Sequence, residues 1–428
     1  MSPSLRNEPQ LALEAIRKKL IGKKLNYKEI YSVMDQIAND RLGEVLTTYF
    51  AASGYSKGFS EDEIYFLTKA MVETGEKLYF SGIVADKHSI GGTPGTRTTM
   101  ILVPIIAAAG FKIPKSSSRA ITTPGGTADT MEVLAKVSFT KEKIKTIVEK
   151  INGCIVWGGS FNIAPADDAI IKVEKPLLFE SYDKILVSVM AKKIAFGSNH
   201  VVIDIPVGKT MKVGHMRDGE ILKEKFEKLA KKFKIKIHVF VHKAEEPAGR
   251  GVGPVLEARE VLRVLQQKSN RPFDLEERSI ELSGGLLELC LEDAPSKKEI
   301  LKKYDWRPRD WACYLLRTGA AWKKMQEIIS AQGGNPKIDS EDLKPGSHSH
   351  EVKSPHKGYV GEINNKNLTI ICRILGAPTE KKAGIYLNKK IGEIFGKGET
   401  LFTLYSSNQE NLHEARETLK NIHIYNLE

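Results

Sequence analysis

Residues 86–100 read DKHSIGGTPGTRTTM, a stretch that joins one lysine, three glycines and several hydroxyl side chains to the start of an apolar run. Backbone amides freed by glycines at a helix N-terminus bind anions, and Lys87 adds a full positive charge. The spacing is neither that of a P-loop nor that of the dinucleotide-binding fingerprint. By itself the stretch is compatible with a structural turn or with a phosphate site.

A second stretch of the same kind follows at residues 116–132, SSSRAITTPGGTADTME. Its serines and threonines precede Pro124, and Gly125, Gly126 and Thr127 then stand at a predicted helix start. Two hydroxyl- and glycine-rich turns that each precede a helix can converge on one oxyanion from neighbouring sheet edges. The pair therefore predicts a phosphate site more specifically than either turn alone.

The remaining pattern predicts a helical N-terminal block followed by an α/β fold. Apolar residues recur at spacings of three and four through the first 80 residues, and SEDE at residues 60–63 has the form of a capping box. From about residue 82, short apolar strands such as VVIDIPV at residues 201–207 alternate with glycine-rich turns and helices. Alternation over residues 235–241 predicts a strand with one well-buried face. This order indicates a largely parallel sheet.

A stretch rich in Pro, Gly, Ser and His at residues 344–357 predicts a linker, and we place a domain boundary near residue 340. Beyond it, GYVGEI, LTIICRIL and KGETLFTLYS have β character, and the tail after Ser406 ends in a polar helix. Three histidines in the linker could bind a metal ion, but they have no acidic or thiol neighbours, so a polar linker is favoured. They are His348, His350 and His356.

Composition limits the class of protein. A chain of 428 residues predicts two or three domains, and 41% hydrophobic with 28% charged residues is a globular composition. The longest apolar run, residues 100–111, is too short to cross a bilayer, and the N-terminus lacks the apolar core of a secretory signal. The four cysteines form no CxxC pair. We expect a cytoplasmic protein with reduced thiols and no membrane partner.

The net charge of +12 attracts polyanions or phosphorylated metabolites. In residues 223–236, KEKFEKLAKKFKIK, lysine and glutamate alternate around apolar residues at helical spacing, which is typical of a solvated helix face. A protein that binds nucleic acid would interleave exposed aromatic residues with basic ones, and aromatic residues make up only 7% here. We therefore expect no nucleic-acid partner.

Several motifs occur in an order that resembles the type II nucleoside phosphorylases, which comprise thymidine, pyrimidine nucleoside and AMP phosphorylases. The resemblance covers roughly residues 8–428, and SSRAIT, Val173 and Lys212 resemble the AMP phosphorylase branch. The thymidine branch has an arginine that grips the pyrimidine where Val173 stands. The motifs are DKHSIGG, SSRAIT, GGTADTMEVL, NIAPADD, SVMAKK, DIPVG, GRGVGP and AQGGNP.

The resemblance implies three domains and a homodimer. The fold would be α/β, with a helical domain, an α/β domain built on a mostly parallel sheet, and a small C-terminal α+β domain. The helical domain would comprise residues 1–80 with a returning segment at about 164–193. The α/β phosphate-binding domain would comprise residues 81–163 and 194–340, and the C-terminal domain residues 341–428.

The activity implied by the resemblance is that of a pentosyltransferase. Inorganic phosphate would cleave nucleoside 5′-monophosphates (AMP, and also CMP and UMP) to the free base and ribose 1,5-bisphosphate, without an organic cofactor or a metal. Lys212 would reach the 5′-phosphate. The implied phosphate site comprises Lys87, Ser89, Thr99, Ser117 and Thr127. The implied nucleotide site comprises Gly92, Ser118, Arg119, Ala120, Ile121, Thr122, Thr123, Thr127, Ser188, Lys192 and Lys212.

The proton donor to the leaving base maps by resemblance onto Glu180, where the AMP phosphorylases have an aspartate. A glutamate can serve as general acid if burial raises its pKa. Asp183 and His88 are nearby alternatives, whereas the Asp167–Asp168 pair is better explained as helix caps or supports. Without the resemblance, the sequence around two further cationic residues is explained by a structural role. Lys192 fits a solvated helix lysine, and Arg250 in GRGVGP fits a turn that pins the α/β domain.

Three other functions are open to a chain with these motifs. A thymidine or pyrimidine nucleoside phosphorylase would release a pentose 1-phosphate, but Val173 and Lys212 favour the nucleotide. An enzyme like anthranilate phosphoribosyltransferase shares the core architecture and uses a magnesium-bound diphosphate, but the motif order disfavours it. A nucleic-acid-binding protein is the alternative from another class, and the sparse aromatic residues disfavour it.

Overall fold

The computed structural model describes residues 9–120, 123–174 and 181–428, and the chain divides into two compact units. The helical unit comprises Met1–Asp86, Gly158–Val201 and Ile221–Ile237. The α/β unit comprises Lys87–Trp157, Val202–Glu220 and His238–Glu428. The helical unit is thus assembled from three separate parts of the chain.

The helical unit is built on four N-terminal helices, as the apolar spacing predicts. The predicted capping box is present at the start of α4. The Ser60 hydroxyl accepts a hydrogen bond from the Glu63 amide, and the Glu63 carboxylate accepts one from the Ser60 amide. Glu63 also forms a buried ion pair of 2.8 Å with Lys19. α8 packs against α2 and α3, and α9 packs against α4. The helices are α1 (Pro9–Leu20), α2 (Tyr27–Ala38), α3 (Gly43–Lys57), α4 (Glu61–Glu73), α8 (Pro165–Glu174) and α9 (Tyr182–Ala195).

Two strand groups carry the α/β region. One sheet has the order β1 (Ala85–Ser89), β4 (His200–Val207), β5 (Lys236–Lys243), and α10 (Met216–Lys232) connects its last two strands. In the second, β2 (Ile113–Ser117) and β3 (Gly153–Trp157) pair in parallel with Ile113 opposite Gly153. All eight residues of β4 are buried. β5 differs from expectation, because its residues on both faces are mostly half-buried and only Val239 is fully buried.

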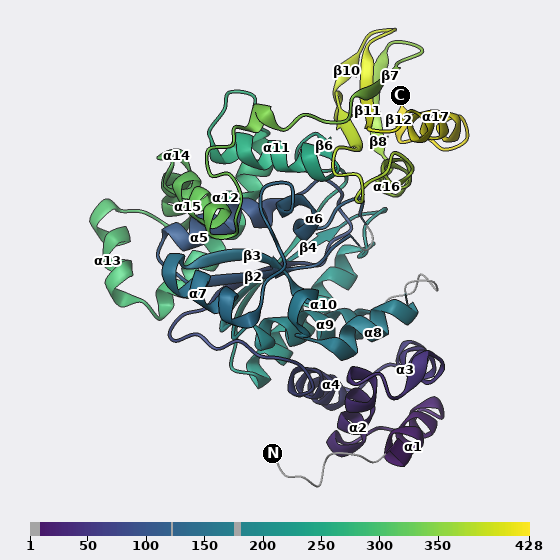
Figure 1. Ribbon diagram of the computed structural model, residues 1–428, viewed down its shortest axis with the longest axis vertical. Coiled ribbons are helices and arrows are strands. Elements are labelled where there is room, and N and C mark those ends of the chain that lie inside the picture. The colour runs from purple at the N-terminus through teal and green to yellow at the C-terminus, as the bar shows by residue number, and fades with distance from the viewer. Residues whose placement is uncertain (1–8, 121–122, 175–180) are drawn as a thin grey trace. The chain divides into compact units, whose positions relative to one another are not determined.

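Helix α5 (Thr98–Ala108) packs against both strands of the second pair. Its residues from Thr98 to Ala107 are buried. It also packs against α12 (Phe273–Glu292) and α15 (Ala320–Ala331), which lie beside it in Figure 1. Gly319 takes a left-handed conformation and separates α14 (Pro308–Arg317) from α15. The remaining helices are α6 (Thr127–Met131), α7 (Lys141–Ile151), α11 (Pro254–Leu265) and α13 (Pro295–Tyr304).

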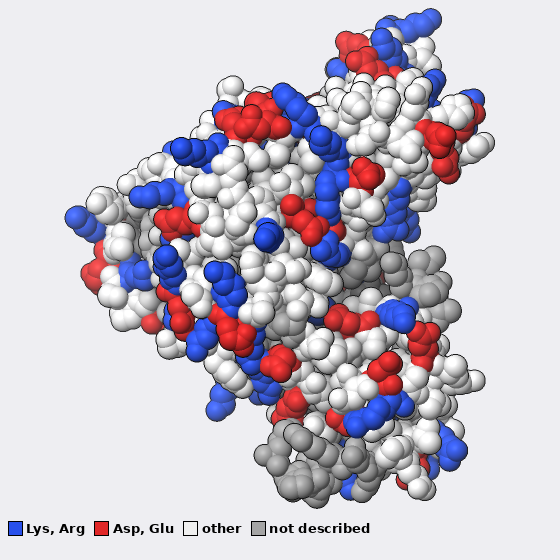
Figure 2. All heavy atoms as spheres, in the orientation of Figure 1, with Lys and Arg blue, Asp and Glu red and all other residues white. Residues whose placement is uncertain are grey.

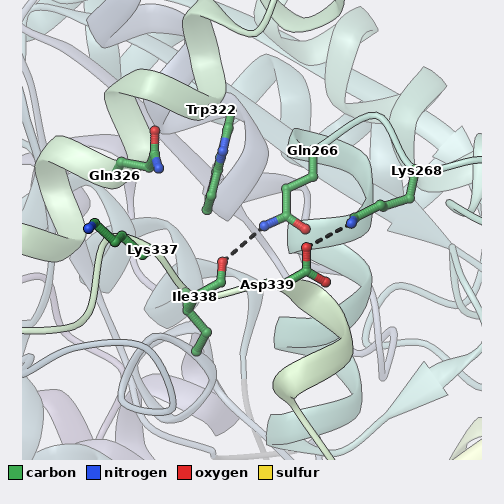
Figure 3. Close-up of a pocket in the computed structure, with 7 residues that line it drawn as sticks. All are labelled: Gln266, Lys268, Trp322, Gln326, Lys337, Ile338 and Asp339. Carbon is green, nitrogen blue, oxygen red and sulfur yellow. Dashed lines mark hydrogen bonds and ion pairs between the residues drawn. The ribbon is translucent and has the colours of Figure 1, made fainter.

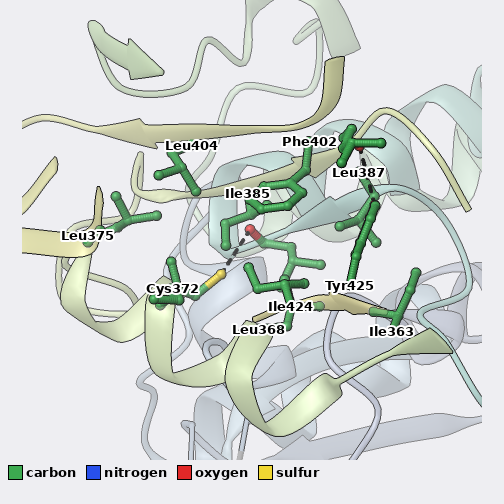
Figure 4. Close-up of a cluster of buried hydrophobic side chains, with 14 of the residues drawn as sticks. Ile363, Leu368, Cys372, Leu375, Ile385, Leu387, Phe402, Leu404, Ile424 and Tyr425 are labelled. Carbon is green, nitrogen blue, oxygen red and sulfur yellow. Dashed lines mark hydrogen bonds between the residues drawn. The ribbon is translucent and has the colours of Figure 1, made fainter. Parts of the chain in front are cut away.

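The C-terminal part has two small sheets and a hydrophobic core of its own (Figure 4). One sheet has the order β6 (Gly251–Val252), β9 (Gly384–Leu387), β11 (Thr400–Ser406), β7 (His348–Lys353). The other has the order β10 (Ile394–Phe395), β8 (Gly358–Ile363), β12 (Tyr425–Leu427). Val252 of β6 belongs to the same core, so this core includes a residue from the preceding segment.

Three sequence predictions for the C-terminal part are wrong. The predicted linker contains β7, because residues 348–353 pair with β11. LTIICRIL belongs to helix α16 (Asn365–Ile374), where Asn364 caps the N-terminus. The tail has the predicted polar helix, α17 (Gln409–Thr418), but the chain then forms strand β12, which pairs with β8.

Among the described residues, no helix is both long enough and apolar enough to cross a membrane.

Candidate functional site

Lys87 of β1 lies buried beside the N-terminus of α5. Its ammonium donates to the hydroxyls of Thr98 at 3.0 Å and Thr99 at 3.3 Å. Burial lowers the pKa of Lys87 to about 8, although the nearby Asp204 carboxylate opposes this shift. The first turn of α5 receives no side-chain cap from Arg97. A buried cation therefore stands beside two hydroxyls and an uncapped helix start, which is the chemistry of an oxyanion site.

The predicted nucleotide residues Gly92 and Lys212 are neighbours. Gly92 has a φ of 98°, and a Cβ atom there would lie 2.9 Å from the backbone nitrogen of Lys212. This contact admits only glycine, because the left-handed backbone and the close approach both exclude a side chain. Thr93 adds a second contact between the two segments, since its hydroxyl lies 3.3 Å from the sulfur of Met211. The glycine-rich turn therefore packs directly against the segment that carries Lys212.

The second predicted turn folds back onto the start of α6. A Cβ atom on Gly126 would lie 2.4 Å from the carbonyl oxygen of Ser118. Asp129, which is buried, accepts from the amides of Ala120 at 2.7 Å and Gly126 at 2.9 Å through one oxygen. These bonds bring Ser118 and Ala120 next to Thr127, the first residue of α6. Thr123 bonds within the turn, to the Gly125 carbonyl at 2.8 Å.

Ser117 and Arg119 stand in different environments. The Ser117 hydroxyl is buried at the end of β2 and has no hydrogen-bond partner among the described residues. The Arg119 guanidinium, in contrast, pairs with Glu132 at 2.8 Å and lies over the Trp157 ring. Arg119 therefore holds the turn in place with its side chain, whereas the Ser117 hydroxyl is available to a ligand.

The predicted base-binding residues Ser188 and Lys192 share one carboxylate in the helical unit. Both bond to Oδ2 of Asp167 at 2.7 Å, and Lys184 lies 3.7 Å from Oδ1. Burial alone would raise the pKa of Asp167, but Lys192 and Lys184 outweigh it and lower the pKa to about 2. Asp167 thus supports the other two residues, and Lys192 is anchored by an ion pair rather than fully solvated.

Some predicted residues lie outside the described residues, and others have structural partners. Glu180, Ile121 and Thr122 belong to the first group. Asp183, the alternative acid, bonds to Lys225 at 2.6 Å and to the Phe59 amide at 3.2 Å. His88 is half-buried in β1, and Ser89 donates to Asp204 at 3.0 Å.

Arg250 has the structural role that the residues alone favoured. Its guanidinium donates to the carbonyl oxygens of Leu387 and Asn388, at 3.2 Å and 2.8 Å, and pairs with Glu393. Its backbone amide donates to the buried Glu260. The GRGVGP turn is therefore fastened to the C-terminal sheet.

Other surface features lie apart from these residues. A pocket of about 420 Å³ is lined by residues that bond to one another, Lys268 to Asp339 at 2.7 Å and Gln266 to the Ile338 carbonyl at 3.0 Å (Figure 3). None of the predicted site residues lines it. Figure 2 shows lysine and arginine interspersed with acidic side chains on the displayed face. Within the described ranges, no group of three His, Cys, Asp or Glu could hold a metal ion.

Sequence reasoning did not single out Asp129 or Asp204. Asp204 is the one acidic residue in the apolar strand VVIDIPV, and Asp129 lies in the first turn of α6. A carboxylate within a buried apolar strand is a signal for a buried charge pair. The partners of Asp204 include Lys87, His242 and Arg278, which come from segments far apart in the sequence, so no local pattern identifies them.

Three models of known protein families match parts of this chain. Residues 13–75 match the helical bundle domain of a glycosyl transferase family, residues 81–238 its a/b domain, and residues 359–425 the pyrimidine nucleoside phosphorylase C-terminal domain. An AMP phosphorylase of Methanocaldococcus jannaschii is 42% identical over 409 residues, which is 95% of this chain and 79% of that protein. The chain belongs to the AMP phosphorylase family.

Further AMP phosphorylases show the same level of similarity. The protein of Thermofilum pendens is 42% identical over 96% of this chain and 78% of its own, and that of Methanococcus maripaludis is 43% identical over 94% and 77%. Membership in this family makes the chain a pentosyltransferase, as the sequence motifs predict. The predicted AMP phosphorylase branch is therefore confirmed.

One solved structure supports the fold alone. Anthranilate phosphoribosyltransferase of Thermus thermophilus has a TM-score of 0.60 and 17% sequence identity, and the match covers 74% of this chain and 99% of that one. This likeness confirms the predicted fold class, a helical domain with an α/β domain and a small C-terminal domain.

Proposed function

We propose that this protein cleaves AMP with inorganic phosphate. A phosphate oxygen attacks C1′ of the ribose, the bond from C1′ to the base breaks, and a proton is delivered to the departing adenine. The products are adenine and ribose 1,5-bisphosphate. CMP and UMP are further candidate substrates. Family membership supports the reaction class.

The observation that carries the proposal is the cation at the start of α5. Lys87 stands with Thr98 and Thr99 beside an uncapped helix terminus, and Ser117 has a buried hydroxyl without a partner in the described chain. A phosphate dianion would receive both a full charge and hydroxyl donors there. Fixing the nucleophile in this way contributes to catalysis by proximity and orientation.

Specificity for a nucleotide over a nucleoside is assigned to Lys212. Its backbone touches the glycine-rich turn at Gly92, so its side chain starts beside the proposed phosphate-binding segment. A lysine there would add a charge-assisted contact to the 5′-phosphate. Ser188, Lys192 and the proton donor Glu180 stay predictions for the base side of the reaction, with Asp167 as the support of the first two.

The decisive experiment measures phosphate-dependent adenine release from AMP and from adenosine. We expect release from AMP, and we expect Lys212→Ala to raise KM for AMP by about 10- to 100-fold, the loss of one contact between charged groups. Adenosine turnover should change little in the same variant. CMP, UMP, uridine and thymidine complete the substrate series.

Lys209→Ala is the matched control, because this nearby lysine is exposed and pairs with Glu362 on the surface. Its kinetics should equal those of the wild type. Efficient release of thymine or uracil from the nucleosides, with no need of a 5′-phosphate, would replace the proposal by a nucleoside phosphorylase.

Assembly as a homodimer and a cytoplasmic location are proposed with this function. Large apolar side chains on the surface of α3, Val45 at 70% exposure and Tyr49 at 53%, support association. The cysteines among the described residues are free thiols, which is compatible with a reducing compartment.

A further inference from the structure

Asp204 connects the proposed phosphate site to two other elements. It lies on β4, the middle strand of the order β1–β4–β5, and is buried. Its Oδ2 accepts from the Ser89 hydroxyl at 3.0 Å and lies 3.7 Å from the Lys87 ammonium. Its Oδ1 lies 3.1 Å from Nε2 of His242 on β5 and accepts from Arg278 of α12. One oxygen therefore faces the phosphate-site lysine and the other faces a second pair of nitrogen donors.

The surroundings of Asp204 make this carboxylate costly unless it is paired. Val202, Ile203 and Ile205 beside it in the strand are fully buried. A carboxylate in such a place loses its hydration and needs charged hydrogen-bond donors. Burial alone would raise the pKa of Asp204, but Lys87, His242 and Arg278 outweigh it and lower this pKa far below its ordinary value.

Two cationic side chains approach the Asp204 carboxylate. Lys87 and Arg278 both face this carboxylate, and Arg278 also pairs with the exposed Glu281 at 2.5 Å. The two ring nitrogens of His242 lie 3.1 Å from the Asp204 carboxylate and 3.1 Å from the Lys243 carbonyl oxygen. A phosphate dianion at Lys87 would pair with its ammonium on the side away from Asp204. Without Asp204, the cations would repel one another within a buried region.

We propose that Asp204 is a positioning residue that keeps Lys87 charged and aimed at the phosphate, with His242 and Arg278 holding Asp204 in place. This inference rests on the proposed function for the identity of the bound anion. Asp204 does not touch the phosphate itself, because its oxygens are already engaged by four side chains. It acts through Lys87.

The proposal predicts opposite pH effects for two substitutions. The charged groups around Lys87 include Asp204 of β4, Arg278 of α12 and Arg97 before α5. Arg278 also pairs with Glu281 and Arg97 with Glu257, and His242 of β5 faces Asp204. Burial lowers the pKa of Lys87 to about 8, Asp204 raises it, and the two arginines lower it further. Asp204→Asn should therefore lower the pKa of Lys87, whereas Arg278→Gln should raise it.

Anion binding reports the charge of Lys87 directly. Only the ammonium form binds a dianion strongly, so affinity falls as pH rises through the pKa of Lys87. Phosphate changes its own charge near neutral pH, but sulfate remains a dianion throughout. We therefore choose inorganic sulfate as the probe and calorimetric titration of the full chain between pH 6 and pH 9.5 as the measurement.

We expect sulfate affinity of the wild type to decline around pH 8. In Asp204→Asn the decline should begin at lower pH and make binding about fivefold weaker than wild type at pH 8. In Arg278→Gln the decline should move to higher pH. Glu414→Gln removes an equal charge from the exposed face of α17 and should follow the wild-type curve.

Two results would overturn the proposal. One is a set of curves that fall at the same pH in wild type and both variants, and the other is a shift in the same direction for both. If Asp204→Asn does not fold, as judged by its melting curve, the sign of the Arg278→Gln shift alone decides. Adenine release from AMP is measured in parallel. Sulfate binding with the expected shifts but no adenine release would contradict the proposed function and leave the positioning role of Asp204 standing.

Discussion

At the scale of one residue, Ser117 offers the most direct test of the proposed phosphate site. Its hydroxyl is buried at the end of β2 without a hydrogen-bond partner in the described part of the chain. A buried hydroxyl in that state costs free energy that a bound ligand can recover. This distinguishes Ser117 from its neighbour Arg119, whose guanidinium is already paired with Glu132.

Replacing Ser117 by alanine should separate binding from stability. We expect KM for phosphate to rise about tenfold, because a donor to a charged group is lost, while the melting temperature stays equal or increases slightly. Steady-state kinetics with varied phosphate and a thermal melt measure the two effects.

Ser283→Ala is the comparison for Ser117→Ala. This buried serine of α12 donates to the Ser279 carbonyl at 2.6 Å, so its loss should cost about 1 kcal/mol of stability and leave the phosphate KM unchanged. An unchanged phosphate KM in Ser117→Ala would remove Ser117 from the proposed site.

At the scale of an element, the turn at residues 118–120 and the start of α6 form one rigid piece. Asp129 accepts from amides on both sides, and the Ala128 amide donates to the Ser118 carbonyl at 3.3 Å. Gly126 permits this contact because it has no side chain. The spacing between the turn and the helix therefore depends on a single missing Cβ atom.

Gly126→Ala should force the turn and α6 apart. The new Cβ atom would lie 2.4 Å from the Ser118 carbonyl oxygen, so the backbone must move. We expect a loss of about 1–3 kcal/mol in stability and a clear increase in KM for both phosphate and AMP. Gly214→Ala, where a Cβ atom meets nothing within 4 Å, should leave both unchanged. Wild-type kinetics in Gly126→Ala would contradict a role for this contact.

Acid stability is a property of the whole molecule, because carboxylates in ion pairs with a lowered pKa occur in both units. Burial would raise the pKa of Asp167 in the helical unit, but Lys192 and Lys184 lower it to about 2. Hydrogen bonds from Arg119 and Lys381 lower the pKa of Glu132 in the α/β unit to about 2. A carboxylate with a depressed folded-state pKa stabilises the fold above its unfolded-state pKa, and that stabilisation is lost as pH falls towards the folded value.

We therefore expect the melting temperature to fall steeply between pH 4 and pH 2. Asp167→Asn should melt several degrees below the wild type at pH 7, because it removes the buried carboxylate that pairs with Lys192 at 2.7 Å, while Lys184 keeps Glu174 at 2.8 Å. The difference in melting temperature between Asp167→Asn and the wild type should become smaller as pH approaches 2. Glu44→Gln, which breaks an exposed pair with Lys172, should melt like the wild type at every pH. A constant difference between Asp167→Asn and wild type over this range would contradict the assignment.

Local interactions explain what could be predicted from the sequence. The capping box at Ser60 and Glu63, the apolar strand at residues 201–207 and the glycine-rich turns depend on neighbours within a few residues. Family motifs located the proposed phosphate and nucleotide residues, and the structure places Lys87 beside Thr99 and Gly92 beside Lys212. These features could be predicted because they depend on residue spacing and backbone conformation within a few residues of the chain.

Tertiary contacts decided the rest. The run at residues 368–375 is apolar enough for a strand, but the cap at Asn364 and the burial of Leu368, Ile371, Cys372 and Leu375 on one face make it a helix. Pairing with β11 turned a predicted linker into β7. The Asp204 cluster joins β1, β4, β5 and α12, segments far apart in the chain. The sequence alone determined the family and the local turns, whereas burial and charge partners depend on which distant segments meet, and only folding brings those together.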